Sequence, residues 1–336
     1  MSKFRTAVIG CGSIAGAHLQ VLCTSGYTEV IALCDILPEK STALAERFLL
    51  SVPHFTDYVE MLDVTKPDFV HICTPHYLHA EMAIAALKRD INVYLEKPAA
   101  IDEADLSALL QAEKESRGRI TVSFQNRTLP EAHRFFELVE ENGGALGGRA
   151  MVTWHRGKTY YGDDWHGVLS KEGGGVMMNQ AIHSLDLLLC AMNGEPLSVR
   201  GEIGLYENAS FSEVEDNAAL LISYPDERRI VFCASNNYPQ DAPNYIEVMT
   251  KNRKLISLLG KKLLINGDPE PIEEDFLKID GKPCWGSGHF RCIGEFYHAV
   301  RDNLPVPVSL SSATLAVRIL LALYRSEGKT VTLPPL

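Results

Sequence analysis

The sequence predicts an α/β domain with a parallel, doubly wound sheet, followed by an α+β domain with a large, mostly antiparallel sheet. In residues 1–123, short apolar and β-branched runs alternate with helical patterns, which is typical of a parallel sheet covered by helices. In residues 124–336, the strand-like runs alternate apolar and polar side chains, which indicates a sheet with one buried and one wetter face. A chain of 336 residues is too long for one ordinary core, so we expect two domains with these boundaries.

The elements of the first domain follow from its apolar spacing. Thr6 to Ile9 is apolar and β-branched and leads into a glycine turn, and the residues after that turn have helical periodicity. The same alternation then repeats along the domain. The expected strands are 6–9, 29–34, 69–73, 92–95 and 120–124, and the expected helices are 15–22, 39–48, 80–87 and 102–115.

The second domain begins with a helical pattern and a turn, Asn142-Gly143-Gly144, and continues with runs of alternating polarity. A long helical pattern follows near the C-terminus. The expected helices are 131–141 and 311–326, and the expected strands are 149–154, 197–205, 218–224, 229–235 and 245–250.

The composition is that of a globular protein without a basic surface. Hydrophobic residues make up 46% of the chain and charged residues 22%, which excludes a disordered or collagen-like protein. The net charge of −11 disfavours nucleic acid and anionic membranes, because both need a basic face. No apolar run reaches the ~18 residues of a membrane helix, and the N-terminus lacks the apolar stretch of a secretory signal. We therefore expect a cytoplasmic protein with no nucleic-acid or membrane partner.

The cysteines and clustered histidines indicate neither disulfides nor a metal site. No Cys-x-x-Cys pair occurs, and several cysteines lie in apolar runs, where a free thiol packs as a small hydrophobic group. His71, Cys73, His76 and His79 lie close together, but they straddle a strand end and a proline-containing turn without zinc-ligand spacing. We expect reduced cysteines and no bound metal.

The glycine turn has the spacing of a dinucleotide-binding fingerprint. Gly10-Cys11-Gly12-Ser13-Ile14-Ala15 matches G-x-G-x-x-G/A, with alanine in the third place. Gly10 permits a tight turn, and Gly12 lets the backbone approach a pyrophosphate. The pyrophosphate would rest on N–H groups at the start of the following helix, which includes Ser13 and Ile14.

Asp35 lies at the end of the second expected strand, at the position where an acidic residue binds the adenosine ribose. Its charge would repel a 2′-phosphate, and no basic residue follows until Lys40, so NAD is favoured over NADP. An aspartate at a strand end can also simply cap the next turn.

Several later segments follow the fingerprint in a recognisable order. They include Thr74-Pro75-His76-Tyr77-Leu78-His79, Glu96-Lys97-Pro98, and a triple glycine at residues 173–175 that leads to His183. Over nearly its whole length the chain resembles the Gfo/Idh/MocA family of oxidoreductases, which are similar to glucose-fructose oxidoreductase and inositol dehydrogenase. Glu96-Lys97-Pro98 and the triple glycine are the most specific parts of this resemblance.

The resemblance implies a Rossmann domain that binds NAD and a second domain that holds a carbohydrate substrate. It implies that Lys97 contacts the reacting hydroxyl and that His183 transfers a proton. Relatives often carry aspartate where this chain has Asn179, so the usual carboxylate is absent at that position. The expected cofactor contacts are Gly10, Gly12, Ser13, Ile14, Asp35, Thr74, Pro75, His79, Glu96, Lys97 and Gln125, and the expected substrate contacts are Asn179, Tyr160, Tyr161, Trp165 and Arg127.

These residue types suit the oxidation of a carbinol. An imidazole titrates near neutrality, so His183 can act as acid or base. Lys97 can stabilise a developing alkoxide or, if desolvated, share the proton transfer. Asn179 lies four residues before His183, which places both on one helix face, where the amide can bond sugar hydroxyls. On spacing alone, His183 could equally be a core histidine that bonds a backbone carbonyl, and Lys97 could be a surface lysine at a strand end.

The remaining candidates each have a structural alternative. The aromatic rings of Tyr160, Tyr161 and Trp165 suit a sugar face or the nicotinamide ring, and they equally suit core packing. Gln125 and Arg127 follow the last strand of the first domain, where relatives line the active-site cleft. Arg127 can instead form a structural ion pair.

We therefore expect an NAD-dependent oxidoreductase that moves a hydride between nicotinamide and a carbinol carbon of a sugar, polyol or glycoside. A redox-assisted glycosidase, with tightly bound NAD and a transient keto-sugar, would use the same residues. A non-catalytic NAD-binding sensor is the other alternative, although it would be expected to lack Lys97 or His183. An open sheet in the second domain suits a homodimer or homotetramer.

Overall fold

The computed structural model describes residues 3–272 and 287–334, which form two compact units. Residues 3–128 and 287–313 make up the first unit, and residues 129–272 and 314–334 make up the second. Each unit has its own sheet. The first break in the chain lies close to the expected boundary at residue 123, but the chain later returns to the first unit.

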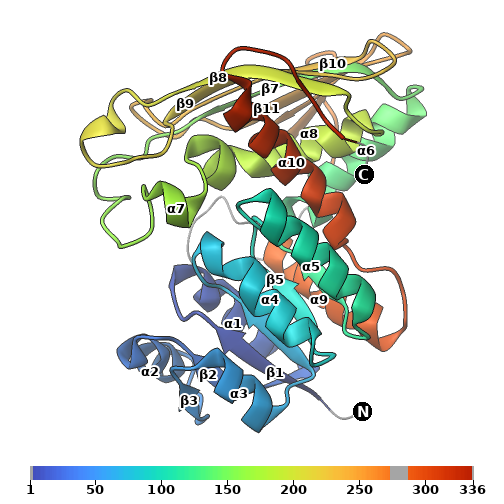
Figure 1. The fold of residues 1–336 in the computed structure, drawn as a ribbon. Coiled ribbons are helices and arrows are strands. Elements are labelled where there is room, and N and C mark those ends of the chain that lie inside the picture. The colour runs from blue at the N-terminus through green and yellow to red at the C-terminus, as the bar shows by residue number, and fades with distance from the viewer. Residues whose placement is uncertain (1–2, 273–286, 335–336) are drawn as a thin grey trace. The chain divides into compact units, whose positions relative to one another are not determined.

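The first unit is built on a six-stranded parallel sheet in the order β3-β2-β1-β4-β5-β6 (Figure 1). The strand order reverses between β1 and β4, as in a Rossmann domain, and ligands bind at the carboxyl ends of the strands at such a point. The strands are β1 (Phe4–Ile9), β2 (Thr28–Cys34), β3 (His54–Phe55), β4 (Phe69–Ile72), β5 (Asn92–Leu95) and β6 (Ile120–Val122). The helices are α1 (Ser13–Thr24), α2 (Pro38–Arg47), α3 (Tyr58–Thr65), α4 (His79–Leu87), α5 (Glu103–Glu115) and α9 (Gly288–Arg301).

Helix α9 explains why the chain returns to the first unit. Its buried face includes Phe296 and Tyr297, and the Tyr297 ring stacks on Phe69 of β4 with centroids 4.0 Å apart. The Tyr297 hydroxyl also lies 2.9 Å from the Thr6 hydroxyl of β1. This placement differs from the expected domain of residues 124–336, because contacts between distant segments leave no trace in local periodicity.

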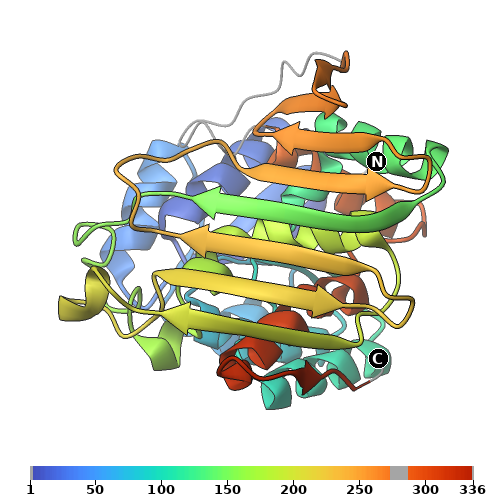
Figure 2. The same cartoon turned by 90° about the horizontal axis from the view of Figure 1, so that it is seen from above.

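The second unit is built on a nine-stranded sheet in the order β14-β13-β12-β11-β7-β10-β9-β8-β15 (Figure 2). Its described neighbours pair antiparallel, except β7 and β10, which run parallel. The strands are β7 (Ala145–Thr153), β8 (Ser198–Gly204), β9 (Asn217–Ser223), β10 (Arg229–Ser235), β11 (Tyr245–Thr250), β12 (Leu255–Leu259), β13 (Lys262–Ile265), β14 (Asp268–Pro269) and β15 (Val331–Thr332).

Helices cover one face of this sheet. Helix α8 (Ile182–Met192) packs on β7 and β11, and α6 (Pro130–Glu141) packs on β12 and β13. Figure 2 looks onto the opposite face of the sheet. Met151 of β7 and Val231 of β10, which lie on neighbouring strands, are exposed. The long helix α10 (Leu310–Ser326) belongs to this unit from Thr314 onward.

The fold class is confirmed, and the expected elements agree with the observed ones to within two residues at each end, except at β7. That strand begins at Ala145 rather than at residue 149, because Gly147 and Gly148 conceal its first half. The seven cysteines in the described ranges are free, and Cys284 lies outside them. Within residues 3–272 and 287–334, no helix has both the length and the apolar character needed to cross a membrane.

Candidate active site

The glycine turn between β1 and α1 has the geometry that a pyrophosphate requires. Gly10 has φ +85°, and a Cβ there would lie 2.6 Å from the carbonyl oxygen of Cys73. A Cβ at Gly12 would meet no protein atom within 4 Å, so this side of the turn is open. Gly12 is also the N-cap of α1, and Ser13 beside it is exposed. The first turn of α1 therefore presents backbone N–H groups to an approaching anion.

Asp35 ties the glycine turn to the end of β2. One carboxylate oxygen accepts the backbone N–H of Cys11 at 2.8 Å, and the other accepts that of Leu37 at 2.9 Å. A carboxylate has further lone pairs for hydroxyl donors, so these turn contacts leave capacity for a ribose. Burial, with Asp35 nearby, raises the pKa of the Cys11 thiol to about 12 and keeps it protonated.

The loop after β4 contains a polar atom without a hydrogen-bond partner. This loop and the glycine turn follow the carboxyl ends of two neighbouring parallel strands, so both lie at the same edge of the sheet. The hydroxyl oxygen of Thr74 is buried, and it has no hydrogen-bond partner among the described residues. His79 is buried between the carbonyl oxygens of Thr74 (2.8 Å) and Pro98 (2.7 Å), and so links this loop to the cis Lys97–Pro98 peptide. The open glycine turn and the orphaned hydroxyl fit a bound dinucleotide, with Pro75 in the same loop.

Glu96 is buried at the centre of a polar chain. Its carboxylate accepts a hydrogen bond from His18 Nε2 at 2.9 Å, and His289 Nε2 lies 3.7 Å away. The chain continues from His18 Nδ1 to His71 Nδ1 at 2.8 Å and from His71 Nε2 to the Tyr297 hydroxyl at 3.0 Å. Although burial alone would raise it, His18 and His289 hold the pKa of Glu96 well below its ordinary value. The carboxylate that precedes Lys97 is therefore fixed and ionised.

The candidate ligand atoms of His18, Glu96 and His289 lie within 4.8 Å of one another, which is the spacing of a possible metal site. These three residues are not the cluster of His71, Cys73, His76 and His79 that the sequence brings together. In that cluster, His71 is in β4, and His76 and His79 follow the end of the strand. The 2.9 Å between His18 Nε2 and Glu96 Oε1 is that of a direct hydrogen bond. Two ligands on a shared zinc ion would lie roughly 3.3 Å apart, given bonds of ~2.0 Å. The arrangement is that of a direct hydrogen bond from the His18 imidazole to the carboxylate.

The other candidates of the first unit lie after β5 and β6. Lys97 is half-buried and directly follows Glu96. Gln125 is buried in the short helix η2 (Gln125–Thr128). Arg127 donates to the Ser312 hydroxyl at 2.9 Å, and its guanidinium lies 5.6 Å from the Phe124 ring centroid. These contacts lie within its own unit, as does a longer hydrogen bond of 3.3 Å to the Ser312 carbonyl oxygen.

In the second unit, a buried carboxylate positions the triple glycine. Glu215 accepts the N–H groups of Gly175 at 2.6 Å and Met177 at 3.0 Å, and the Tyr324 hydroxyl at 3.2 Å. A Cβ on Gly174 would lie 2.0 Å from the Tyr324 hydroxyl, and one on Gly175 would lie 2.0 Å from the Glu215 carbonyl oxygen. Glycine is required at both positions because the chain passes this close to its neighbours.

The segment after the glycines is a π-helical turn, η3 (Val176–Ala181), which contains Asn179 and leads into α8. The sequence suggested one continuous helix face for Asn179 and His183, but the change from η3 to α8 falls between them. Such turns are rare and occur often at functional sites. His183 is the second residue of α8 and is half-buried.

Asn179 is bonded to a carboxylate that the sequence analysis did not identify. Its Nδ2 donates to Glu172 Oε1 at 2.6 Å and to the Tyr160 hydroxyl at 3.0 Å. Gln180 Nε2 donates to the same hydroxyl at 3.0 Å. Glu172 is buried at the end of the short helix α7 (Leu169–Glu172), and no local motif marks it. The carboxyl group of Glu172 is therefore hydrogen-bonded to the side chain at position 179, where relatives often carry aspartate.

The aromatic candidates form one cluster around Tyr160. Its ring centroid lies 5.2 Å from that of Tyr161 and 4.7 Å from that of His166, and the Trp165 ring lies 3.7 Å from the His166 ring. Burial raises the pKa of Tyr160, so its hydroxyl stays protonated at neutral pH. The structure thus brings together Tyr160, Tyr161, Trp165 and Asn179.

The six-stranded parallel sheet and the glycine turn between β1 and α1 are together typical of a dinucleotide-binding protein with a Rossmann fold. A model of the oxidoreductase family with an NAD-binding Rossmann fold matches residues 4–124, and a model of the GFO/IDH/MocA C-terminal domain matches residues 137–256. The chain therefore belongs to the Gfo/Idh/MocA family, and its first unit is an NAD-binding Rossmann domain.

Curated relatives match part of the chain. It is 30% identical to the D-glucoside 3-dehydrogenase of Escherichia coli (strain K12) over 189 residues, which cover 55% of this chain and 53% of that protein. It is 29% identical to the inositol 2-dehydrogenase of Salmonella typhimurium over 125 residues, 37% of each chain. The chain thus spans about half or less of the length of these relatives.

Solved structures share the fold over the full length. The WlbA dehydrogenase from Bordetella pertussis, in complex with NADH and UDP-GlcNAcA, aligns with a TM-score of 0.85 at 23% identity over 99% of this chain and 100% of that one. A levoglucosan dehydrogenase in complex with NADH and levoglucosan aligns with a TM-score of 0.87 at 19% identity over 100% of both chains. At these identities the likeness establishes the fold.

Replacing Gly12 with alanine should separate cofactor binding from folding. The added methyl meets no protein atom, so we expect an unchanged melting temperature. It would intrude on the pyrophosphate, so NAD affinity should fall by at least about tenfold, measured by calorimetric titration. Gly10→Ala is the contrasting control and should lower the melting temperature, because its Cβ meets the Cys73 carbonyl. Unchanged NAD affinity in Gly12→Ala would show that the pyrophosphate does not approach this turn.

Asp35→Asn should relax the preference for NAD over NADP. The substitution removes the charge that repels a 2′-phosphate and keeps one oxygen, which can accept one of the two turn N–H groups. We expect the ratio of NADP to NAD affinity to rise about tenfold, measured by titration of both cofactors. Asp57→Asn is the matched control, since Asp57 also accepts two backbone N–H groups, at the start of α3. An unchanged ratio in Asp35→Asn would place the ribose contact elsewhere.

The first unit should lose stability on mild acidification. Burial lowers the pKa of His18 and His71 below the ordinary 6.5, so below that pH each binds a proton less readily in the folded protein than in the unfolded chain. The depressed pKa of Glu96 acts in the same direction at lower pH. For each histidine that stays neutral, the free energy of unfolding falls by about 1.4 kcal/mol per pH unit below 6.5.

Urea unfolding between about pH 7.5 and pH 5.5 measures this loss. His71→Asn should make the slope shallower, because it removes one of the titrating groups. A stability that does not change across this range would contradict the buried neutral histidines.

Proposed function

We propose that this protein is an NAD-dependent dehydrogenase that oxidises or forms a carbinol carbon of a sugar, polyol or glycoside. The observation that carries the proposal is the polar set of the second unit, in which Asn179 and Gln180 both bond the Tyr160 hydroxyl. Amides and a protonated phenol donate to and accept from hydroxyls, and the adjoining aromatic rings suit the C–H face of a sugar.

Lys97 and His183 have the chemistry that the reaction needs. Bound NAD would accept the hydride. The ammonium group of Lys97 stabilises the oxygen as it develops alkoxide character, and the preceding carboxylate of Glu96 is fixed by His18. The imidazole of His183 takes the hydroxyl proton and returns it in the reverse direction. Asn179 holds a substrate hydroxyl and is itself held by Glu172.

The relatives support the same substrate class. Two of them are named as a D-glucoside 3-dehydrogenase and an inositol 2-dehydrogenase, whose substrates by name carry ring hydroxyls. The open face of the nine-stranded sheet, with Met151 and Val231 exposed, suits a homodimer or homotetramer.

Lys97→Ala should abolish hydride transfer and leave NAD binding intact. We expect turnover to fall at least about 100-fold, because removal of a single group that stabilises an oxyanion has an effect of this size. The assay follows the absorbance of reduced nicotinamide with NAD and a panel of sugars, polyols and glycosides. Lys114→Ala, at the end of α5, is the control lysine of the same unit and should retain wild-type turnover.

Near-normal turnover in Lys97→Ala would overturn the catalytic assignment. In the wild-type protein, a steady reduced-nicotinamide signal with release of an aglycone would replace the dehydrogenase by a redox-assisted glycosidase. Binding of NAD without turnover of any panel member or release of any aglycone would favour an NAD-binding sensor.

A further inference from the structure

A polar pocket lies in the second unit beside the Tyr160 cluster. It has a volume of about 190 Å³ and lies where the chain leaves β7 and β10, which we call the β7–β10 pocket. Since β7 and β10 run parallel, both strands end at the same edge of the sheet. The side chains that the argument uses are Arg156, Lys158, Asn208, Phe211, Asn236 and Glu207.

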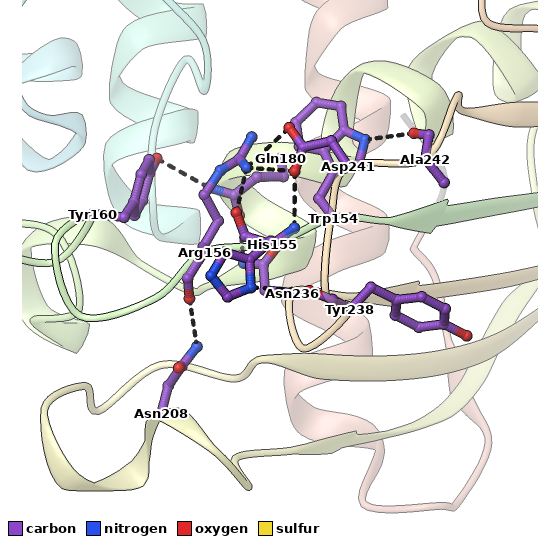
Figure 3. A network of polar contacts seen from close by, with 10 residues as sticks. All are labelled: Trp154, His155, Arg156, Tyr160, Gln180, Asn208, Asn236, Tyr238, Asp241 and Ala242. Atoms are coloured by element: carbon purple, nitrogen blue, oxygen red, sulfur yellow. Dashed lines mark hydrogen bonds and ion pairs between the residues drawn. The ribbon is translucent and has the colours of Figure 1, made fainter.

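The inner wall of the pocket contains an unsatisfied acceptor. Asn236 is 1% exposed, and its Nδ2 donates to Gln180 Oε1 at 3.0 Å (Figure 3). Its Oδ1 is buried and has no hydrogen-bond partner among the described residues. Buried amide oxygens are nearly always paired, so this atom indicates a missing O–H or N–H donor. A carboxylate or phosphate would not supply one.

The side wall is rigid. Arg156 donates to both carboxylate oxygens of Asp241, at 2.9 and 3.1 Å, and its guanidinium lies 4.8 Å from the Trp154 ring centroid (Figure 3). The Arg156 backbone N–H donates to the Asn236 carbonyl oxygen at 3.0 Å, and Asn208 Nδ2 donates to the Arg156 carbonyl oxygen at 3.2 Å. The wall is thus held in place before any ligand arrives, which lowers the cost of binding.

The charges around the pocket balance. The charge of Arg156 is matched by Asp241. The remaining pair among these side chains, Lys158 and Glu207, consists of one cation and one carboxylate. An anionic ligand therefore gains no net attraction here. Amide groups, a charged rim and the Phe211 ring together suit a neutral ring that carries several hydroxyls.

The pocket is joined by hydrogen bonds to the polar set of the proposed function. Asn236 bonds Gln180, Gln180 bonds Tyr160, and Tyr160 accepts from Asn179. The volume lies below the ~300–1,000 Å³ of sites for drug-sized ligands, so it suits one ring rather than an extended chain. We propose that the β7–β10 pocket binds the second, non-reacting neutral sugar ring of a disaccharide or glycoside. This inference rests on the proposed function for the identity of the reacting ring.

Binding without turnover tests the pocket separately from the reaction. Calorimetric titrations of the full chain, without NAD, compare glucose with the neutral disaccharides maltose, cellobiose and trehalose. We expect at least one disaccharide to bind about tenfold more tightly than glucose. Asn236→Ser, which cannot place an oxygen at the Oδ1 position, should reduce that affinity to the level of glucose.

Two further variants keep the test decisive. Asn142→Ser is the matched control outside the pocket. It removes one hydrogen bond, from the side-chain amide of Asn142 to the Leu138 carbonyl oxygen at the end of α6. Phe211→Ala removes the half-buried ring that lines the pocket, and should weaken the disaccharide even if Asn236→Ser does not fold.

Equal affinity for glucose and every disaccharide, unchanged in Asn236→Ser and Phe211→Ala, would overturn the pocket proposal even if the enzyme oxidises sugars. Tighter binding of a disaccharide that carries a uronic acid than of its neutral counterpart would overturn the neutral-ring assignment. Disaccharide binding that depends on Asn236, in a protein that produces no reduced nicotinamide, would support the pocket and refute the dehydrogenase.

Discussion

A buried carboxylate must be met by hydrogen-bond donors, and this constraint organises both candidate catalytic segments. In the first unit, the Glu96 carboxylate lies close to the imidazoles of His18 and His289, and Glu96 directly precedes Lys97 in the sequence. In the second, Glu215 takes up the N–H groups of Gly175 and Met177 at the start of the π-helical turn. An unpaired buried charge would cost several kcal/mol, so neither segment can shift without a large loss of stability. The candidate side chains therefore extend from backbone whose position is fixed by charge.

The same constraint changes how the asparagine in the second unit is interpreted. In the sequence, Asn179 stands where relatives often have aspartate, which suggests a lost charge. In the structure, Glu172 bonds the Asn179 amide and also accepts the Gly167 N–H at 2.6 Å. A carboxyl group is thus still present next to this position, hydrogen-bonded to the Asn179 amide. An amide cannot take a proton, so in the proposed reaction the proton transfer is assigned to His183 and Lys97.

The features that the sequence predicts are those with a local cause. Strand periodicity identifies the buried strands, and the spacing of Gly10 and Gly12 follows from one turn and one helix start. The return of α9 to the first unit depends on the stacking of Tyr297 on Phe69, two residues far apart in the chain. Glu172 and Asn236 likewise act through partners that no spacing rule connects to them. Long-range pairing of side chains is the part that a single sequence does not reveal.

Strand direction determines where the second unit can carry recognition chemistry. Antiparallel neighbours send successive chain ends to opposite edges, whereas the parallel β7 and β10 both end at one edge. The segments that follow, which carry Arg156 and Asn236, are then held side by side by the backbone bond between these two residues. Tyr160 follows four residues after Arg156, and the guanidinium lies 5.4 Å from its ring centroid. One parallel pairing in an otherwise antiparallel sheet thus brings the β7–β10 pocket and the Tyr160 cluster to the same edge.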